Sequence, residues 1–118
     1  MRLTEISYDS AKPIEGYGPG FFRVGGHVLR GSCLITPWDA GAWGGYDDAG
    51  APLSLAGRID VLFVGTGTEI AQVPPAFRAA LEAAGIGVEV MNAPAACRTY
   101  NVLLSEGRRV AAALFPVD

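Results

Sequence analysis

Histidine and cysteine are scarce in this chain of 118 residues, and their scarcity excludes several kinds of chemistry. His27 is the single histidine, so neither a histidine-based catalytic triad nor a metal site with several histidines can form. The two cysteines, Cys33 and Cys97, lie far apart and form no Cys-x-x-Cys motif. We therefore predict no metal site, no cofactor and no catalytic residue, and we expect a protein that is not an enzyme.

Positive charge and long apolar runs are scarce as well. Nine basic residues stand against twelve acids, so the chain lacks the basic face of a nucleic-acid binder. No stretch approaches the ~20 apolar residues of a membrane-spanning helix. The N-terminal segment carries Glu5 and Asp9 and no apolar core, which argues against a targeting peptide. We expect a cytoplasmic protein that neither binds nucleic acid nor inserts into a membrane.

Apart from these scarce residue types, the chain has the composition of one globular domain. Half of the residues are apolar and 18% are charged, as in ordinary soluble proteins. A chain of this length buries roughly 65% of its unfolded surface and needs neither metal nor disulfide. We predict a single domain over residues 1–118, with Cys33 and Cys97 as free, buried thiols. Abundant arginine, alanine and glycine indicate a bacterial origin, and the oligomeric state stays open.

The first part of the chain has the pattern of β-strands. Phe21–Val24 and His27–Arg30 flank Gly25-Gly26, a pair of residues suited to a tight hairpin turn. We interpret Gly31 as a bulge, after which Ser32–Thr36 continues the strand.

A long segment from Pro37 to Ala56 is rich in glycine, aspartate and alanine, and we predict that it is irregular. It nevertheless contains Trp38, Trp43 and Tyr46. Two interpretations stay open. These aromatic side chains either fold back over one face of the sheet or form a surface for a protein partner, since Trp and Tyr are favoured interface anchors.

The second part predicts a βαβαβ arrangement. Ile59–Val64 is apolar without alternation, as in a central strand covered on both faces. Apolar spacing and turn residues predict helices over Pro75–Ala84 and Pro94–Ser105, with strands at Ile86–Met91 and Val110–Phe115. The residues expected to be largely buried are Leu62, Val64, Phe77, Leu81, Val90, Tyr100, Leu103 and Leu114.

A candidate ligand site lies where the predicted strands end. In open α/β sheets, ligands bind outside the carboxyl ends of the strands. Gly65-Thr66-Gly67 follows the first such strand, and the helix after the second could hold an anion through its N–H groups and Arg98. Arg98 and Asn101 share one helix face, and asparagine is a poor helix former whose amide often binds something specific. The alternative is structural: the glycines serve a tight strand exit, and the helix face is solvated.

The chain also resembles a known family over about residues 3 to 116. The residues that carry the resemblance are Val64-Gly65-Thr66-Gly67, Pro74-Pro75, Gly85-Ile86, Met91, Ala95-Ala96, Arg98-Thr99-Tyr100-Asn101 and Glu106-Gly107-Arg108. They are similar to the Mth938-like domain, a single-domain family of unknown function. Its eukaryotic branch includes the third assembly factor of mitochondrial respiratory complex I.

The resemblance implies a three-layer α/β fold, with a mixed central sheet, two helices and an additional β layer. It implies no enzymatic activity, and for the mitochondrial branch it implies an assembly role beside the membrane with a partner assembly factor. We therefore expect a binding or assembly accessory for complex I, with a protein partner and at most peripheral membrane association. The alternative is a domain that binds a small ligand or an anion at the strand ends, through Gly65, Thr66, Gly67, Arg98 and Asn101.

Overall fold

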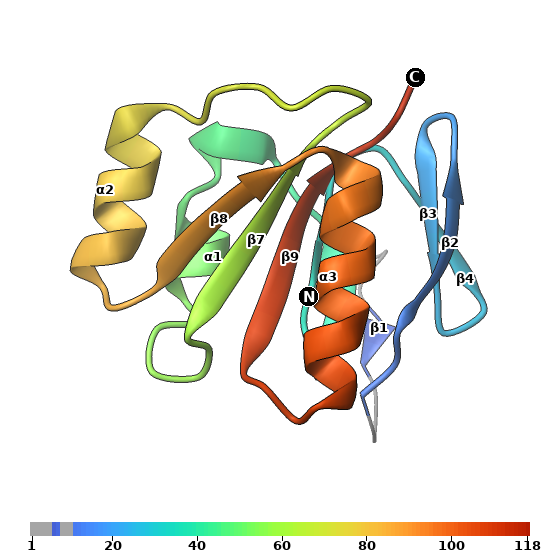
Figure 1. The fold of residues 1–118 in the computed structure, drawn as a ribbon, viewed down its shortest axis with the longest axis horizontal. Coiled ribbons are helices and arrows are strands. Elements are labelled where there is room, and N and C mark those ends of the chain that lie inside the picture. Colours follow the sequence, from blue (N-terminus) through green and yellow to red (C-terminus); the bar gives the residue numbers. More distant parts are fainter. Residues whose placement is uncertain (1–5, 8–10) are drawn as a thin grey trace.

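The computed structural model describes residues 6–7 and 11–118, and this part of the chain forms two β-sheets with helices on the larger one (Figure 1). The main sheet has six strands in the order β1-β6-β5-β9-β7-β8, and the small sheet has the order β2-β3-β4. The strands are β1 (Ile6–Ser7), β2 (Ile14–Gly18), β3 (Phe21–Val24), β4 (His27–Arg30), β5 (Cys33–Ile35), β6 (Asp39–Ala42), β7 (Val61–Thr66), β8 (Gly87–Met91) and β9 (Val110–Phe115). The helices are η1 (Gly45–Asp47, a 3-10 helix), α1 (Gly50–Leu53), α2 (Pro75–Ala83) and α3 (Ala93–Ser105).

The main sheet is mixed, which confirms the predicted fold class. β7 pairs in parallel with β8 on one side and with β9 on the other, whereas β5 pairs antiparallel with β6 and β9. β7 therefore lies inside the sheet, as its uninterrupted apolar sequence predicts. Leu62 and Val64 point to one face and Phe63 to the other, and all three are buried.

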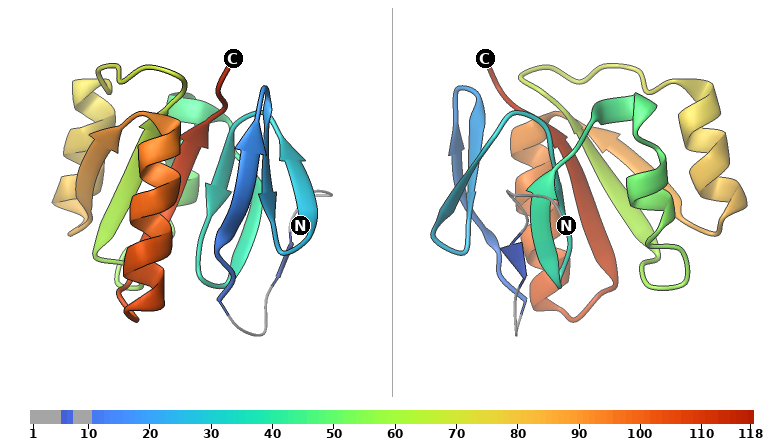
Figure 2. Two further views of the ribbon diagram at one scale, coloured as in Figure 1. Left: turned by 45° about the vertical axis from the view of Figure 1, so that its right-hand side comes forward. Right: turned by 180° about the vertical axis from the view of Figure 1, so that it is seen from behind.

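Two apolar clusters cover the two faces of this sheet. On one face α3 packs against β7 and β9, and the small sheet beside it contributes Phe22, Val24 and Leu29 to the same apolar cluster (Figure 2). On the opposite face lie η1, α1 and α2, whose core side chains include Phe77 and Leu81. Six of the eight residues predicted to be buried are buried, whereas Val90 and Leu103 are only partly buried at the rims of the two clusters.

The two long helices end where capping residues predict. α2 begins at Pro75, whose missing N–H costs nothing in a first turn, and Gly85 follows it with a φ of +85°. α3 begins after Asn92, whose side-chain oxygen accepts a hydrogen bond from the N–H of Ala95 at 2.8 Å. Both helix predictions are confirmed to within a residue or so at their ends.

The small sheet confirms the predicted hairpin and corrects the assignment that follows it. Gly25 and Gly26 both have positive φ, as a type I′ turn between β3 and β4 requires. Gly31 does not mark a bulge. With its φ of +78°, it lies where the chain leaves the small sheet after β4 and enters the main sheet as β5.

The segment from Pro37 to Ala56 is not irregular as predicted, because it contains β6, η1 and α1. A tight turn from Thr36 to Asp39 joins β5 to β6. The Thr36 hydroxyl accepts hydrogen bonds from the N–H groups of Trp38 and Asp39, each at 3.0 Å, and the Thr36 N–H donates to the Asp39 carbonyl at 2.8 Å. Side-chain hydrogen bonds of this kind replace the glycine or asparagine that would have marked the turn.

Candidate functional site

The glycine turn at the end of β7 is a packing feature. A Cβ atom on Gly65 would lie 2.7 Å from Leu114 Cδ2 and 2.9 Å from the Cα of Ala93. Glycine at this position therefore allows the start of α3 to approach the sheet closely. Gly67 has a φ of +98°, and its carbonyl accepts a hydrogen bond from the Ala93 N–H at 2.8 Å. Both glycines support the structural interpretation.

The Thr66 hydroxyl closes the loop that leaves β7. It donates to the Glu69 carbonyl at 2.7 Å and accepts from the Ala71 N–H at 2.9 Å. Thr68 accepts a hydrogen bond from the Asp118 N–H at 2.9 Å and so anchors the C-terminal residue. These contacts occupy the hydroxyl groups that a ligand at the strand ends would use.

The first turn of α3 has no free donor for an anion among the described residues. The Ala93 N–H is bound by Gly67, Pro94 has no N–H, and the Ala95 N–H is bound by the Asn92 cap. An anion at a helix N-terminus needs such N–H groups. The geometry therefore gives no support to the anion pocket that the strand-end rule suggests.

The Asn101 amide binds the backbone of a strand, as the structural alternative for this helix face allows. Its side-chain N–H₂ donates to the Ile14 carbonyl at 2.9 Å, and its oxygen accepts from the Ile14 N–H at 2.8 Å. This two-point contact attaches β2 to α3. Arg98 is exposed on the same helix and makes no hydrogen bond or ion pair with the described residues.

The contact between Asn101 and Ile14 should contribute measurably to stability. Asn101→Ala leaves a partly buried N–H and C=O without partners, so we expect the free energy of unfolding to fall by about 2 kcal/mol. Urea denaturation monitored by circular dichroism measures this difference. Arg98→Ala is the matched control on the same helix, with an expected change within about 0.5 kcal/mol. Equal stability of the two variants would contradict the anchoring role.

Trp43 belongs to the core, and Tyr46 packs against it as a partly buried residue. Trp43 is only 5% exposed, and its indole N–H donates to the Asp48 carbonyl at 2.9 Å. The rings of Trp43 and Tyr46 pack against Phe77 and Phe115, with ring centroids 4.9–6.0 Å apart. Partial burial raises the pKa of Tyr46. The interpretation that these aromatic side chains fold back over the sheet is correct for both residues.

Trp38 is the one residue of the predicted aromatic surface that lies outside this cluster. It is 37% exposed, and the guanidinium carbon of Arg58 lies 4.0 Å from the centroid of its ring. Cation–π stacking of this kind holds an arginine in a defined orientation. Trp38 and Arg58 also separate two surface depressions, of ≈ 220 Å³ and ≈ 240 Å³.

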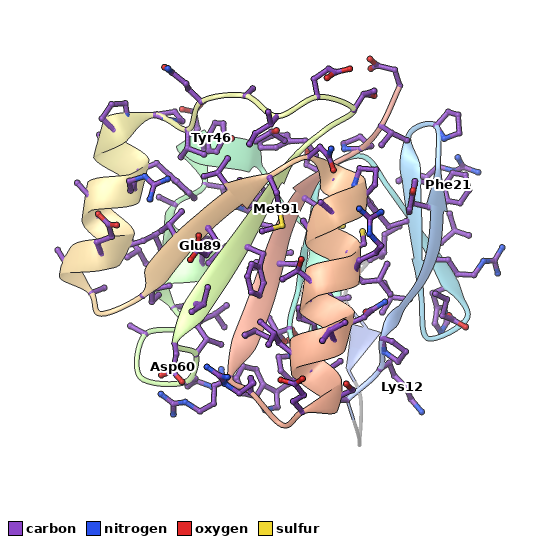
Figure 3. The ribbon with its side chains drawn as sticks, viewed as in Figure 1. Lys12, Phe21, Tyr46, Asp60, Glu89 and Met91 are labelled. Atoms are coloured by element: carbon purple, nitrogen blue, oxygen red, sulfur yellow. The ribbon has the colours of Figure 1, made fainter. Side chains whose placement is uncertain are left out.

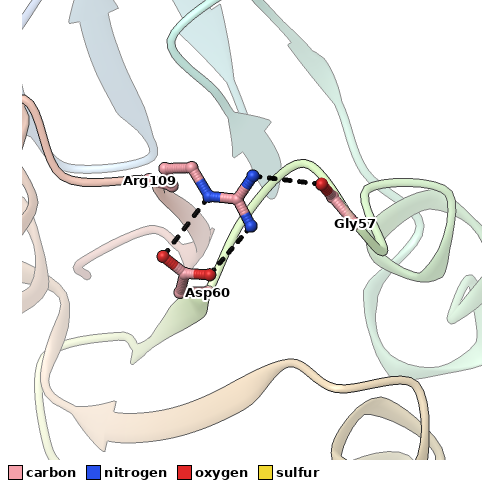
Figure 4. A network of polar contacts seen from close by, with 3 residues as sticks. All are labelled: Gly57, Asp60 and Arg109. Atoms are coloured by element: carbon pink, nitrogen blue, oxygen red, sulfur yellow. Dashed lines mark hydrogen bonds and ion pairs between the residues drawn. The ribbon is translucent and has the colours of Figure 1, made fainter.

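The second of these depressions is basic. Arg58, Arg108 and Arg109 line it together with the apolar side chain of Leu104. Arg109 is neutralised by Asp60, to which it donates hydrogen bonds of 2.9 and 3.3 Å, and it also donates to the Gly57 carbonyl at 3.1 Å (Figure 4). Hydrogen bonding to Arg109 lowers the pKa of the Asp60 carboxyl.

Two guanidinium groups of this depression form no ion pair with the described residues, although the charge of Arg108 also helps to lower the pKa of Asp60. They belong to Arg58 and Arg108, both exposed. The sequence alone predicts neither the depression nor the residues that line it. Arg108-Arg109 reads as an ordinary solvated turn, and Arg58 is isolated in the sequence. Only the fold brings the three arginines to one place.

The cysteines are free and buried, as predicted. Burial is the main reason that the pKa of each thiol is raised, to about 12 for Cys97 and further for Cys33. The charge of Arg98 opposes the shift at Cys97 without overcoming it. At neutral pH both groups are therefore protonated and poorly nucleophilic.

The described residues include no group of three or more His, Cys, Asp or Glu side chains placed to hold a metal ion. None of the helices in this part of the chain has the length and apolar character needed to cross a bilayer.

The described residues form an α/β domain with a mixed main sheet and a small β-sheet beside α3. Comparison with known proteins identifies the family within this class. Residues 14–115 match the family described as protein of unknown function DUF498/DUF598. The chain belongs to this family. An uncharacterized protein of Rhodobacter capsulatus is 50% identical over 117 residues, which cover 99% of this chain and 94% of that protein.

A mammalian protein and a solved structure extend the comparison. Assembly factor 3 of the NADH dehydrogenase [ubiquinone] 1 alpha subcomplex from Mus musculus is 32% identical over 98% of this chain, which spans 66% of the mouse protein. The solution structure of an Mth938-like domain from Bordetella pertussis matches with a TM-score of 0.75 and 28% identity, covering 98% of this chain and 92% of that chain. The resemblance inferred from the sequence is confirmed.

Proposed function

We propose that this protein is a non-enzymatic binding protein that assists the assembly of respiratory complex I. The observation that carries the proposal is the similarity to assembly factor 3, which extends over 98% of the chain. The packed strand ends support it, because the N–H and hydroxyl groups that a small ligand would use there already bind the chain itself. In this role the protein acts from the cytoplasm and reaches the membrane only through the complex.

We place the contact with the partner on Trp38, Arg58 and Arg108. Trp and Arg are the residue types that most often dominate the energy of protein interfaces. Here an exposed indole holds one guanidinium group, and Arg108 lies across the same depression. The matching partner surface presents an acidic side chain next to an apolar one.

Deletion of the gene in its host tests the assembly role. We expect less assembled complex I on native gels and lower rotenone-sensitive NADH oxidation by the membranes, with unchanged transcripts for the complex I subunits. Reintroduction of the unaltered gene should restore both. Normal amounts of assembled complex I in the deletion strain would rule the role out.

Complementation with variants tests the surface. Trp38→Ala should fail to restore assembly, because loss of a Trp anchor weakens binding by about 10-fold or more. Val28→Ala is the matched control: Val28 is 42% exposed and lies on β4, away from both depressions next to Trp38. Restoration by both variants would place the contact elsewhere on the protein.

A further inference from the structure

The outer edge of β8 presents backbone groups that no other strand covers. β8 is the last strand of the main sheet and pairs only with β7. The Gly87 N–H donates to the Asp60 carbonyl at 2.8 Å, so the backbone of Gly87 faces inward. Because the ladder alternates, Glu89 and Met91 also face β7. The N–H and C=O groups of Val88 and Val90 therefore point away from the sheet.

One of these outward groups has a partner in the described part of the chain. Arg78 on α2 donates to the Val88 carbonyl at 3.1 Å. The Val88 N–H and both backbone groups of Val90 form no hydrogen bond with the described residues. Proteins usually cover or block such an edge, since it is a template for pairing with another strand. Here the Arg78 side chain occupies the Val88 carbonyl, and the backbone groups of Val90 remain available to another strand.

An apolar groove runs beside the open half. Its volume is ≈ 550 Å³, and its lining includes Ile70, Val73, Arg78 and Val90. Ile70 is 64% exposed, so it offers most of its apolar side chain to a ligand in this groove. The loop after β7 thus holds apolar side chains next to unpaired backbone groups. This is the arrangement that strand addition uses, with main-chain hydrogen bonds for affinity and side-chain pockets for specificity.

We propose that an extended segment of a partner polypeptide adds to the β8 edge beside Val90. Side chains of an added strand alternate between the two faces of the sheet. Those on the α2 face enter the groove next to Val90 and Val73, so they are apolar. Those on the opposite face lie beside Glu89, which is exposed on the same side of the sheet as α3 (Figure 3). The segment therefore alternates apolar residues with at least one basic residue.

Glu89 also argues against a second copy of this chain as the occupant. An antiparallel pair of β8 strands centred on this position would set Glu89 directly opposite Glu89 of the other copy. Like charges directly opposite each other destabilise a strand pair. A different chain that brings lysine or arginine converts the same position into an attractive pair. The β8 edge therefore favours pairing with a strand of a different protein over pairing with β8 of a second copy of this chain.

This surface is separate from the one assigned to the assembly partner, because the residues that line the groove do not overlap with those around Trp38. The tests therefore use the purified protein. Normal complex I in a deletion strain would leave the β8 proposal standing, and failure of the β8 test would leave the assembly role standing.

Amide hydrogen exchange of the free protein, measured by NMR, tests whether the edge is open. The N–H of Glu89 bonds within the sheet, so it should exchange slowly, whereas the N–H groups of Val88 and Val90 should exchange at least about 10-fold faster. Equal protection of Glu89 and Val90 would mean that the edge is already covered and would overturn the proposal.

Titration with a defined peptide tests strand addition. The probe is an acetylated and amidated heptapeptide that alternates valine with lysine, and its counterpart carries glutamate in place of lysine. The lysine peptide should slow exchange at Val90 and shift the resonances of β8, and it should bind about 1.4- to 5-fold more tightly than its counterpart, as expected for one cross-strand charge pair. Shifts confined to other surfaces would overturn the proposal.

The Glu89→Lys variant provides a gain-of-binding test that does not depend on loss of structure. Glu89 is exposed, so the substitution should leave the fold intact, as a nitrogen-15 correlation spectrum would confirm. The variant should reverse the preference and bind the glutamate peptide more tightly, again by about 1.4- to 5-fold. An unchanged preference would show that Glu89 does not face the bound strand, and the proposed arrangement would be wrong.

Discussion

Trp43→Ala should lower the free energy of unfolding by about 3–5 kcal/mol, the range measured for large aromatic residues removed from cores. Trp43 fills the space between η1, α2 and the end of β9, where it contacts the rings of Tyr46, Phe77 and Phe115. Alanine would leave a cavity and would also leave the Asp48 carbonyl without the indole donor. Urea denaturation, followed by far-ultraviolet circular dichroism, measures the change.

Trp38→Ala is the control for this experiment, because it removes the same side chain from an exposed position. We expect it to cost less than about 1 kcal/mol, mostly through the loss of the contact with Arg58. Trp43→Phe should lie between the two, since it keeps a ring and loses the indole N–H. Similar losses for Trp38→Ala and Trp43→Ala would contradict the placement of Trp43 in the core.

The contrast between these two tryptophans illustrates a limit of sequence analysis. Both lie in a segment that lacks periodicity, and their residue type suits a core and an interface equally. The elements that surround each tryptophan determine whether it lies in the core or on the surface. Trp43 follows β6 and lies over the sheet face that α2 also covers, whereas Trp38 occupies a turn at the end of β5. Neither β6 nor its pairing partner can be recognised locally.

The sequence of β6 shows why this strand cannot be recognised from its own residues. Its sequence, Asp39-Ala-Gly-Ala, contains none of the β-branched or aromatic residues that favour strands. It is a strand because β5 offers it a complete edge and the Thr36 turn sets the register. Tertiary pairing overrides local propensity here. In contrast, β7, α2, β8, α3 and β9 could be predicted because their apolar periodicity, prolines and glycines agree with one another.

The polar residues of the candidate site show a second limit. An asparagine within a helix correctly signals a specific hydrogen-bond partner. The partner of Asn101, however, is the backbone of Ile14, 87 positions earlier in the sequence. Backbone groups have no signature in a sequence, so the choice between a ligand and a strand could not be made. The basic depression was missed for a related reason, because its arginines converge only in the fold.

The carboxyl end of β7 is closely packed for a physical reason that centres on Gly65. The crevice at the carboxyl end of β7 is filled by the first turns of α3, whose Ala93 and Ala96 pack directly over the glycine. A ligand at this position would have to displace the helix. What the strand-end rule treats as a binding crevice is here a contact between helix and sheet.

Gly65→Ala should therefore destabilise the protein severely, by about 3 kcal/mol or more, because the added methyl group meets backbone as well as side chains. Its Cβ would lie 2.7 Å from Leu114 Cδ2, 2.9 Å from the Cα of Ala93 and 3.0 Å from the Cβ of Ala96. Leu114 is fully buried, and the Cα of Ala93 is a backbone atom that no change of rotamer can move, so α3 has to move off the sheet. Thermal and urea denaturation measure the loss, and Gly50→Ala is the matched control because a Cβ there meets nothing within 4 Å. A Gly65→Ala protein as stable as the Gly50→Ala protein would show that the end of β7 has free space, and it would revive the strand ends as a ligand site.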